Sequence, residues 1–153
     1  MGFYKSCYAT RLLQAELLAL EQGLKIALDM SFPTLEIESD SSDMIKTINE
    51  DNALTNNTLL NCRLLMHRLK ISMIRHNFRE GNAVADRLAK EAIKHFNPNR
   101  CFYPARPPLF VETVLEKDMQ GLCFGSRLLS TNVCNSLVAL NNSNVLRDYI
   151  VTM

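Results

Sequence analysis

The chain has 153 residues, of which 47% are hydrophobic and 22% are charged, and its formal net charge is +1. This length is typical of one domain of about 100–200 residues, and the composition excludes a disordered polyampholyte. No apolar run reaches the roughly 18–20 residues of a transmembrane helix, and the N-terminus lacks a signal-peptide pattern. We therefore expect no membrane segment.

The cysteines and the charges give two further constraints. The five cysteines are scattered without a Cys-x-x-Cys pair, which argues against a disulfide framework or a zinc ribbon and favours a reducing, intracellular compartment. No Lys/Arg-rich run marks a nuclear signal, so nucleus and cytoplasm both stay open.

Residues 16–51 hold nine acidic and two basic residues, whereas residues 61–95 hold eight basic and three acidic ones. This asymmetry suits a carboxylate metal site beside a polyanion-binding surface, and it equally suits two solvated surfaces.

The first 50 residues predict two strands and two helices. Residues 2–8 are aromatic and weakly alternating, which favours a strand. Residues 11–30 have helical periodicity after a candidate N-cap at Thr10, and their apolar stripe comprises Leu13, Leu17, Leu20, Leu24, Ala27 and Leu28. Pro33 closes this connection. Residues 34–39 alternate between apolar and acidic side chains as a strand does, and residues 40–50 predict a short helix.

The next 45 residues continue the alternation. After a polar loop at 51–57, residues 58–70 predict a helix with apolar positions Leu60, Leu64, Leu65 and Leu69. Residues 71–77 predict a strand. The last clear helix begins at Gly81-Asn82 and ends near His95, with apolar positions Ala85, Leu88, Ala89, Ala92 and Phe96. Strands that alternate with helices predict the α/β class, with helices packed on a sheet.

The character of the sequence changes after residue 96. Four prolines between 97 and 108 exclude a regular helix or a central strand there. We predict a domain at 1–96, a Pro-rich linker at 97–109 and a poorly ordered C-terminal tail at 110–153. Within this tail, residues 110–119 could form one or two amphipathic turns.

Three acidic residues occupy positions that suit a metal site. Glu16 lies on the flank of the first helix's apolar stripe, Asp40 ends the predicted strand at 34–39, and Asp86 lies about one turn into the last helix. Ligands in open α/β sheets bind beyond the strand ends, and carboxylates there suit Mg²⁺. The pattern also allows Glu16 as a solvated helix residue, Asp40 as a helix N-cap and Asp86 as a first-turn dipole partner.

Three sequence blocks, at residues 15–27, 35–41 and 79–90, together resemble the ribonuclease H family, in its plant reverse-transcriptase-associated, retroelement-type branch. The block at 15–27 resembles that family's first helix, and Leu-Glu-Ile-Glu-Ser-Asp-Ser at 35–41 resembles its fourth strand and second metal-binding carboxylate. Residues 79–90 resemble its R-E-x-N-x-x-A-D-x-L-A signature. The resemblance implies a mixed sheet flanked by helices, and it implies cleavage of the RNA strand of RNA–DNA hybrids.

The resemblance also implies a site and its ligands. Glu16, Asp40 and Asp86 would be the catalytic residues and would hold two Mg²⁺ or Mn²⁺ ions, with Asn82 supporting them as a helix N-cap. One ion would activate water and the other would stabilise the leaving oxygen. The basic residues expected to contact phosphates are Arg68, Lys70, Arg75, Arg79, Arg87 and Lys90. We expect an RNA–DNA hybrid as partner, and neither a membrane nor a small-molecule cofactor.

The chain departs from the family pattern at its N-terminus. The family's first strands and first catalytic Asp precede its first helix by a few dozen residues, whereas here nine residues precede Thr10 and none is acidic. We therefore expect an N-terminally truncated domain with impaired turnover. The alternatives are a non-catalytic nucleic-acid-binding module and a non-functional fragment of a retroelement-derived protein.

Overall fold

The structure is a computed structural model that describes residues 2–32, 35–50, 56–94, 97, 100–120 and 148–151. Its helices are α1 (Leu12–Asp29), α2 (Ser42–Asn49), α3 (Asn57–Arg68), the 3₁₀ turn η1 (Arg79–Asn82), α4 (Ala83–Lys94) and α5 (Leu109–Met119). Its strands are β1 (Tyr4–Lys5), β2 (Leu35–Ser39), β3 (Ile74–His76), β4 (Cys101–Phe102) and β5 (Asp148–Val151). The predicted α/β class is therefore confirmed. Within these residues, no helix combines the length and the apolar character that crossing a membrane requires.

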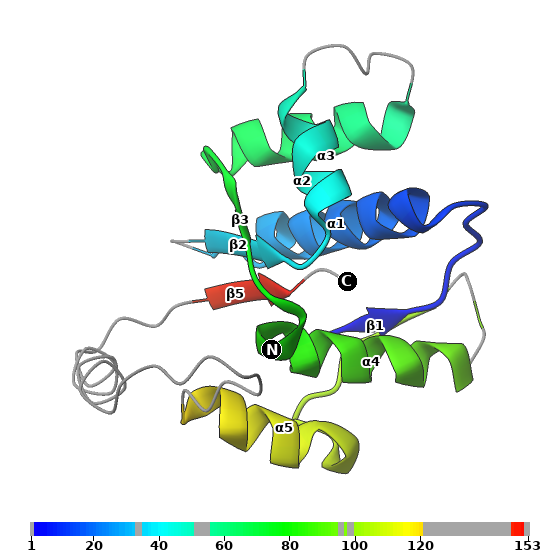
Figure 1. Ribbon diagram of the computed structural model, residues 1–153, viewed down its shortest axis with the longest axis vertical. Helices are drawn as coiled ribbons and strands as arrows, with labels where there is room; N and C mark the ends of the chain where they lie inside the picture. Colours follow the sequence, from blue (N-terminus) through cyan, green and yellow to red (C-terminus); the bar gives the residue numbers. More distant parts are fainter. Residues whose placement is uncertain are drawn as a thin grey trace.

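Two small sheets carry the described strands. The central strand β2 pairs in parallel with β3 on one side and with β5 on the other. The second sheet is the antiparallel pair of β1 and β4. Helices α1, α2 and α3 lie together beyond the first sheet, whereas α4 and α5 lie at the opposite end of the molecule (Figure 1). The sheets and helices thus form two groups that meet between α1 and α4.

The main core forms where α1 packs against β2, β3, α2 and α3. The predicted stripe of α1 is confirmed, because Leu17, Leu20 and Leu24 are at most 1% exposed and the stripe's ends pack against the same core. Each helix turn of this stripe removes roughly one large apolar side chain from water, which stabilises the fold by about 1.5–3 kcal/mol per residue. The stripe therefore fixes which face of α1 points away from the core.

Helix α3 buries only part of the face predicted. Leu65 is buried and Leu69 packs against the core as predicted, but Leu60 and Leu64 are exposed. Leu59, Cys62 and Met66 take the remaining core positions, since leucines stand at adjacent positions 59–60 and 64–65. On the side of α3 near α1, the Asn61 amide donates to Glu21 Oε1 at 3.1 Å.

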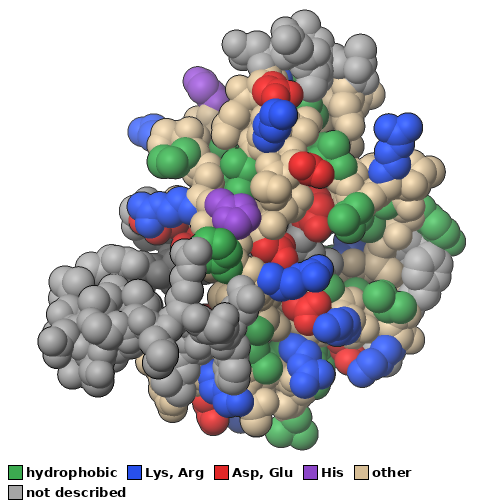
Figure 2. Space-filling view, in the orientation of Figure 1, with side chains coloured by type: hydrophobic (Ala, Val, Ile, Leu, Met, Phe, Trp, Pro, Cys, Tyr) green, Lys and Arg blue, Asp and Glu red, His purple; other side chains and the backbone are tan. Residues whose placement is uncertain are grey.

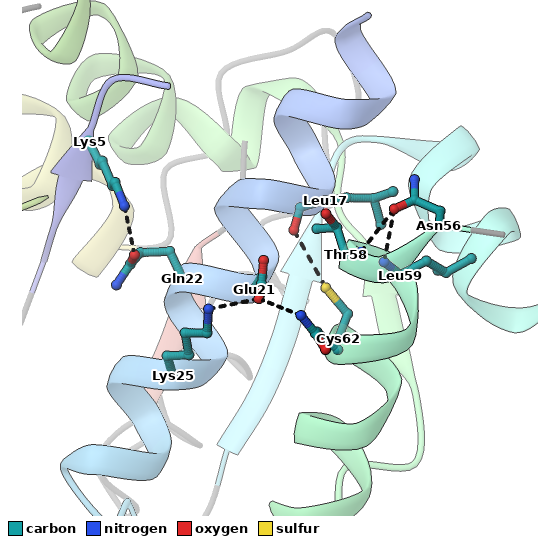
Figure 3. Close-up of polar contacts among 10 residues, drawn as sticks. Lys5, Leu17, Glu21, Gln22, Lys25, Asn56, Thr58, Leu59 and Cys62 are labelled. Atoms are coloured by element: carbon teal, nitrogen blue, oxygen red, sulfur yellow. Dashed lines mark hydrogen bonds and ion pairs between the residues drawn. The ribbon is translucent and has the colours of Figure 1, made fainter. Parts of the chain in front are cut away.

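Polar contacts also join α1 to its neighbours (Figure 3). The Glu21 carboxylate pairs with Lys25 at 2.7 Å, and Lys5 of β1 donates to Gln22 Oε1 at 3.2 Å. The Cys62 thiol donates to the Leu17 carbonyl at 3.5 Å, and burial raises the pKa of this thiol to about 12. Cys62 is therefore a packing residue and not a nucleophile.

A smaller aromatic cluster holds the second sheet to α5. Tyr4 stacks on Phe102 with ring centroids 5.1 Å apart and meets Phe110 edge-on at 6.2 Å. The Arg100 guanidinium lies 4.8 Å from the centre of the Phe102 ring. Helix α5 also packs on α4. These contacts come from residues predicted as linker and tail, but the domain boundaries themselves stay predictions.

Several predicted features lie outside the described residues. They are Pro33, most of the polar loop (51–55), the helix end at His95 and Phe96, and residues 121–147 of the tail. The predicted N-cap at Thr10 is wrong: Arg11 holds that position, and Thr10 instead donates to Gln14 Oε1 at 3.0 Å.

The stripe of α1 gives a stability prediction. Leu20→Ala is expected to lower the free energy of unfolding by about 2–5 kcal/mol, because it leaves a cavity in the main core. Leu12→Ala, on the same helix but 79% exposed, is expected to change it by less than about 0.5 kcal/mol. Urea unfolding of both variants measures the difference. Equal losses would contradict the packing described for α1.

Candidate cation site

A cavity of about 370 Å³ lies between α1, β1, α4 and the end of β2. Glu16, Asp40 and Asp86 all line it, together with Arg79 and Asn82. The rest of its wall includes apolar side chains of α1 and α4 and the side chains of Lys5 and Lys25. The three acidic residues singled out in the sequence therefore come from three elements and face one hollow.

Glu16 is the buried member of this set. It is 8% exposed, because the flank of α1 that carries it turns toward the cavity. Its Oε2 is buried and has no hydrogen-bond partner within the described residues. Burial, and secondarily the nearby Asp40 carboxylate, raise the pKa of Glu16 from 4.5 to about 7, and Arg79 partly opposes this. The interpretation of Glu16 as a solvated helix residue is therefore wrong.

Asp40 follows β2 directly and is held by two neighbours. The Asn82 amide donates to Asp40 Oδ1 at 3.0 Å, and Arg79 Nε lies 3.7 Å from Asp40 Oδ2. The N-cap of α2 is Ser41, whose hydroxyl accepts from the Met44 N–H at 3.3 Å. Asp40 as the N-cap is therefore wrong, and its carboxylate stays turned toward η1.

Asp86 stands in the first turn of α4, and its side chain is 45% exposed. It pairs with Lys90 one turn later at 2.5 Å. Its position agrees with a dipole role at the helix N-terminus, which does not conflict with its place in the cavity wall. Asn82 ends η1 immediately before α4. The predicted roles of Asp86 and Asn82 at a metal centre stay predictions.

The carboxylates are the right type of ligand for a hard cation, but too few of them lie together. In the described part of the chain, no group of three or more His, Cys, Asp or Glu side chains is arranged to hold one metal ion. Glu16 Oε2, which has no hydrogen-bond partner among the described residues, is nevertheless the kind of ligand that Mg²⁺ takes, and Asp40 is close enough to raise the pKa of Glu16. Glu16 and Asp40 are therefore the two members of the set whose chemistry fits a divalent cation.

A family model described as reverse transcriptase-like matches residues 3–92, which is more than half of the chain. The chain belongs to the reverse transcriptase-like family. The matched part is the ribonuclease H-like region of that family, and it contains all three carboxylates. No curated protein and no solved structure matches the chain.

The predicted phosphate-contacting residues do not form one cluster. All six are exposed. Arg79, Arg87 and Lys90 lie on η1 and α4, whereas Arg68 and Lys70 lie at the far end of the molecule, where α3 ends (Figure 1). Figure 2 shows Lys and Arg side chains gathered over α4, with acidic side chains between them. Of these six residues, Arg79 of η1 is the one that lines the cavity.

Two basic residues near α3 have structural contacts that the sequence pattern does not reveal. Arg63 donates to the carbonyls of Thr47, Ile48 and Glu50, which close the C-terminal end of α2. Lys70 has φ of 58°, and the next N–H bonds back to the Met66 carbonyl at 2.9 Å, so Lys70 ends α3 in a left-handed conformation. Arg75 pairs with Glu36 across the sheet at 3.0 Å.

The burial of Glu16 predicts a pH effect on stability. Its pKa is higher in the folded state than in the unfolded state, so the folded state binds more protons between pH 4.5 and about 7. The free energy of unfolding should therefore fall by roughly 2–3 kcal/mol as pH rises through this window, and level off above it.

Glu16→Gln should remove this component of the pH dependence and make the protein more stable than wild type at pH 8. Glu116→Gln, an exposed substitution on α5, should keep the wild-type profile. Urea unfolding at pH 5 and pH 8 measures both variants. Parallel profiles for wild type and Glu16→Gln would contradict the burial of this carboxylate.

Proposed function

We propose that this chain is a nucleic-acid-binding ribonuclease H-like domain of retroelement type. It binds a divalent cation, Mg²⁺ or Mn²⁺, at Glu16 and Asp40, and an RNA–DNA hybrid at the basic side chains of η1 and α4. The family match to residues 3–92 supports the class. The observation that carries the proposal is the buried Glu16 Oε2, which has no hydrogen-bond partner in the described part of the chain, in the cavity that Asp40 also lines.

The buried Glu16 carboxylate needs a compensating charge. Burial, and secondarily repulsion from the Asp40 carboxylate, make its ionised form costly, and the raised pKa of Glu16 expresses that cost. Arg79 compensates only in part, since its side chain is 87% exposed and it approaches Asp40 rather than Glu16. A divalent cation would compensate both carboxylates at once, which favours cation binding over a purely structural role.

Several residues of this chain would have separate roles at the proposed site. Asn82 would hold the Asp40 carboxylate in place, and Glu16 would release its proton when the cation binds. Arg79, Arg87 and Lys90 would attract the backbone phosphates of the hybrid. A divalent cation in such a site polarises a phosphate oxygen and lowers the pKa of bound water.

We propose that turnover is low. Asp86 is already paired with Lys90, so this carboxylate is partly neutralised before any cation binds. This observation favours a second candidate function, a non-catalytic module that binds nucleic acid. The third alternative, a fragment without function, would have no cooperative unfolding transition.

The test of the proposed enzyme is cleavage of a labelled RNA–DNA hybrid, with Mg²⁺ and separately with Mn²⁺, beside a thermal melt of the same sample. We expect slow cleavage of the RNA strand that is lost in Asp40→Asn, because this substitution removes a ligand charge. A DNA duplex of the same sequence is the substrate control. Cleavage that survives Asp40→Asn would contradict the proposal. A cooperative melt without cleavage would favour the binding module, and no cooperative melt would favour the fragment.

The salt dependence of hybrid binding tests the proposed interface. Arg87→Gln should reduce the slope of log Kobs against log salt by about 1, because one phosphate contact is lost. Lys46→Gln removes an equally exposed positive charge from α2, away from α4, and should leave the slope unchanged. Fluorescence anisotropy at several salt concentrations measures both slopes. Equal slopes for the two variants would place the hybrid elsewhere on the surface.

A further inference from the structure

The cavity between α1 and α4 extends beyond the carboxylates that the proposed cation site uses. Glu16, Asp40 and Asn82 gather at one end, since Asn82 donates to Asp40 and Asp40 raises the pKa of Glu16. Gln22 also lines the cavity, six residues beyond Glu16, which corresponds to about 9 Å along α1. The volume of about 370 Å³ lies within the range of small-molecule sites, about 300–1,000 Å³. The cavity therefore has room for an organic ligand.

Apolar side chains from two helices form part of the cavity wall. Helix α1 contributes Leu18 and Ala19, and α4 contributes Leu88 and Ala89, all of them half-buried. A hydrated divalent cation gains nothing from such a wall, because its ligands are oxygen atoms of the protein and of water. An apolar ligand that covers these side chains removes apolar surface from water, which favours binding. The cavity thus has an apolar part that the cation site leaves unused.

The polar groups of the cavity indicate the charge of such a ligand. Toward the Gln22 end, Lys5 donates to Gln22 Oε1 at 3.2 Å. Lys25 pairs there with Glu21 at 2.7 Å, so both cationic groups already have partners. At the other end, Glu16 Oε2 is buried and has no hydrogen-bond partner within the described residues. The group that is left to a ligand is therefore a carboxylate oxygen, and an ammonium group is the donor that matches its charge.

We propose that this cavity binds a small amphipathic amine, whose ammonium group donates to Glu16 and whose flat apolar body lies between α1 and α4. The ammonium group supplies Glu16 Oε2 with the hydrogen bond that no described residue gives it. The apolar body packs against the side chains of both helices. Such a ligand uses the carboxylate end and the apolar wall together, whereas Mg²⁺ uses only the first. This inference does not depend on nuclease activity, and it implies that the amine and a divalent cation compete for Glu16.

Tryptamine is a suitable probe, because it carries an ammonium group on an indole and the chain contains no tryptophan. Its indole fluorescence anisotropy therefore reports on the ligand when excitation lies beyond the tyrosine band. Two analogues of similar shape are the ligand controls: 3-propylindole has a methyl group in place of the ammonium, and indole-3-propionate has a carboxylate. The full chain is titrated at pH 8, where tryptamine is protonated and Glu16, with a pKa of about 7, is mostly ionised.

We expect tryptamine to bind with a Kd below about 1 mM, which is ordinary for a ligand of this size. It should bind at least about tenfold more tightly than 3-propylindole, which cannot make the charge-assisted hydrogen bond. Indole-3-propionate should bind more weakly than either, because its carboxylate would lie near Glu16 and Asp40. No tryptamine binding at about 10 mM, or equal affinities for tryptamine and indole-3-propionate, would overturn the proposal.

Substitutions at both parts of the cavity locate the bound amine. Glu16→Gln should weaken tryptamine binding about tenfold and leave 3-propylindole binding within about twofold, whereas Glu116→Gln on α5 should change neither. Ala19→Phe and Ala89→Phe fill the apolar part from opposite helices, and each should weaken both ligands at least about tenfold. Urea unfolding shows which of these variants fold. Unchanged tryptamine affinity in Glu16→Gln, or in a folded phenylalanine variant, would overturn the proposal.

Competition with Mg²⁺ separates this inference from the proposed function. Saturating Mg²⁺ should raise the apparent Kd of tryptamine at least about fivefold, because both cations need the Glu16 carboxylate. If Glu16→Gln weakens tryptamine binding but Mg²⁺ does not, the amine site stands and the divalent-cation site fails. If Mg²⁺ lowers the pKa of Glu16 but tryptamine does not bind, the amine site is overturned and the divalent-cation site stands.

Discussion

The packing of α1 on the sheet is the constraint on which the rest of the structure depends. Three leucines of α1 are almost completely buried in the core that it shares with β2, β3, α2 and α3. A helix has only one orientation in which that stripe faces the core, so the flank that carries Glu16 must face the cavity. Burial of the three leucines on one side of α1 thus provides the free energy that keeps the Glu16 carboxylate out of water on another side.

The electrostatics of the cavity follow from this arrangement. Glu16 is held near Asp40 because β2 ends beside α1, and Asn82 and Arg79 reach Asp40 because η1 leads from β3 into α4. Ionised Glu16 is therefore unfavourable here, first because it is buried and second because Asp40 is close, and protonation of Glu16 removes this cost at low pH. We propose that such a site serves to bind a cation, because an apolar residue at position 16 would avoid the cost of burying a carboxylate.

The sequence predicted those features of the fold and the site that local residue patterns determine. The stripe of α1, from Leu13 to Leu28, repeats over about four turns, so its buried face was predicted correctly, and the flank position of Glu16 followed from it. The buried face of α3 was predicted only in part, since adjacent leucines at 59–60 and 64–65 allowed two faces, and the packing of Leu59, Cys62 and Met66 into the core is a tertiary feature. The ion pair of Asp86 with Lys90 could have been foreseen from the i, i+4 spacing. The pairing of β2 with β5 joins segments more than 100 residues apart in sequence, and no local pattern could indicate it.

We propose that Glu16 and Asp40 together form a cation site, and the protonation state of Glu16 is the most direct measure of this. We would follow the side-chain carboxyl carbon of Glu16 by ¹³C NMR over pH 4–9, with and without saturating Mg²⁺. We expect an apparent pKa of about 7 without the ion and a decrease of at least about one unit with it, and Asp40→Asn should largely abolish the decrease. The same titration curve for Glu16 with and without Mg²⁺ would contradict cation binding at these two residues.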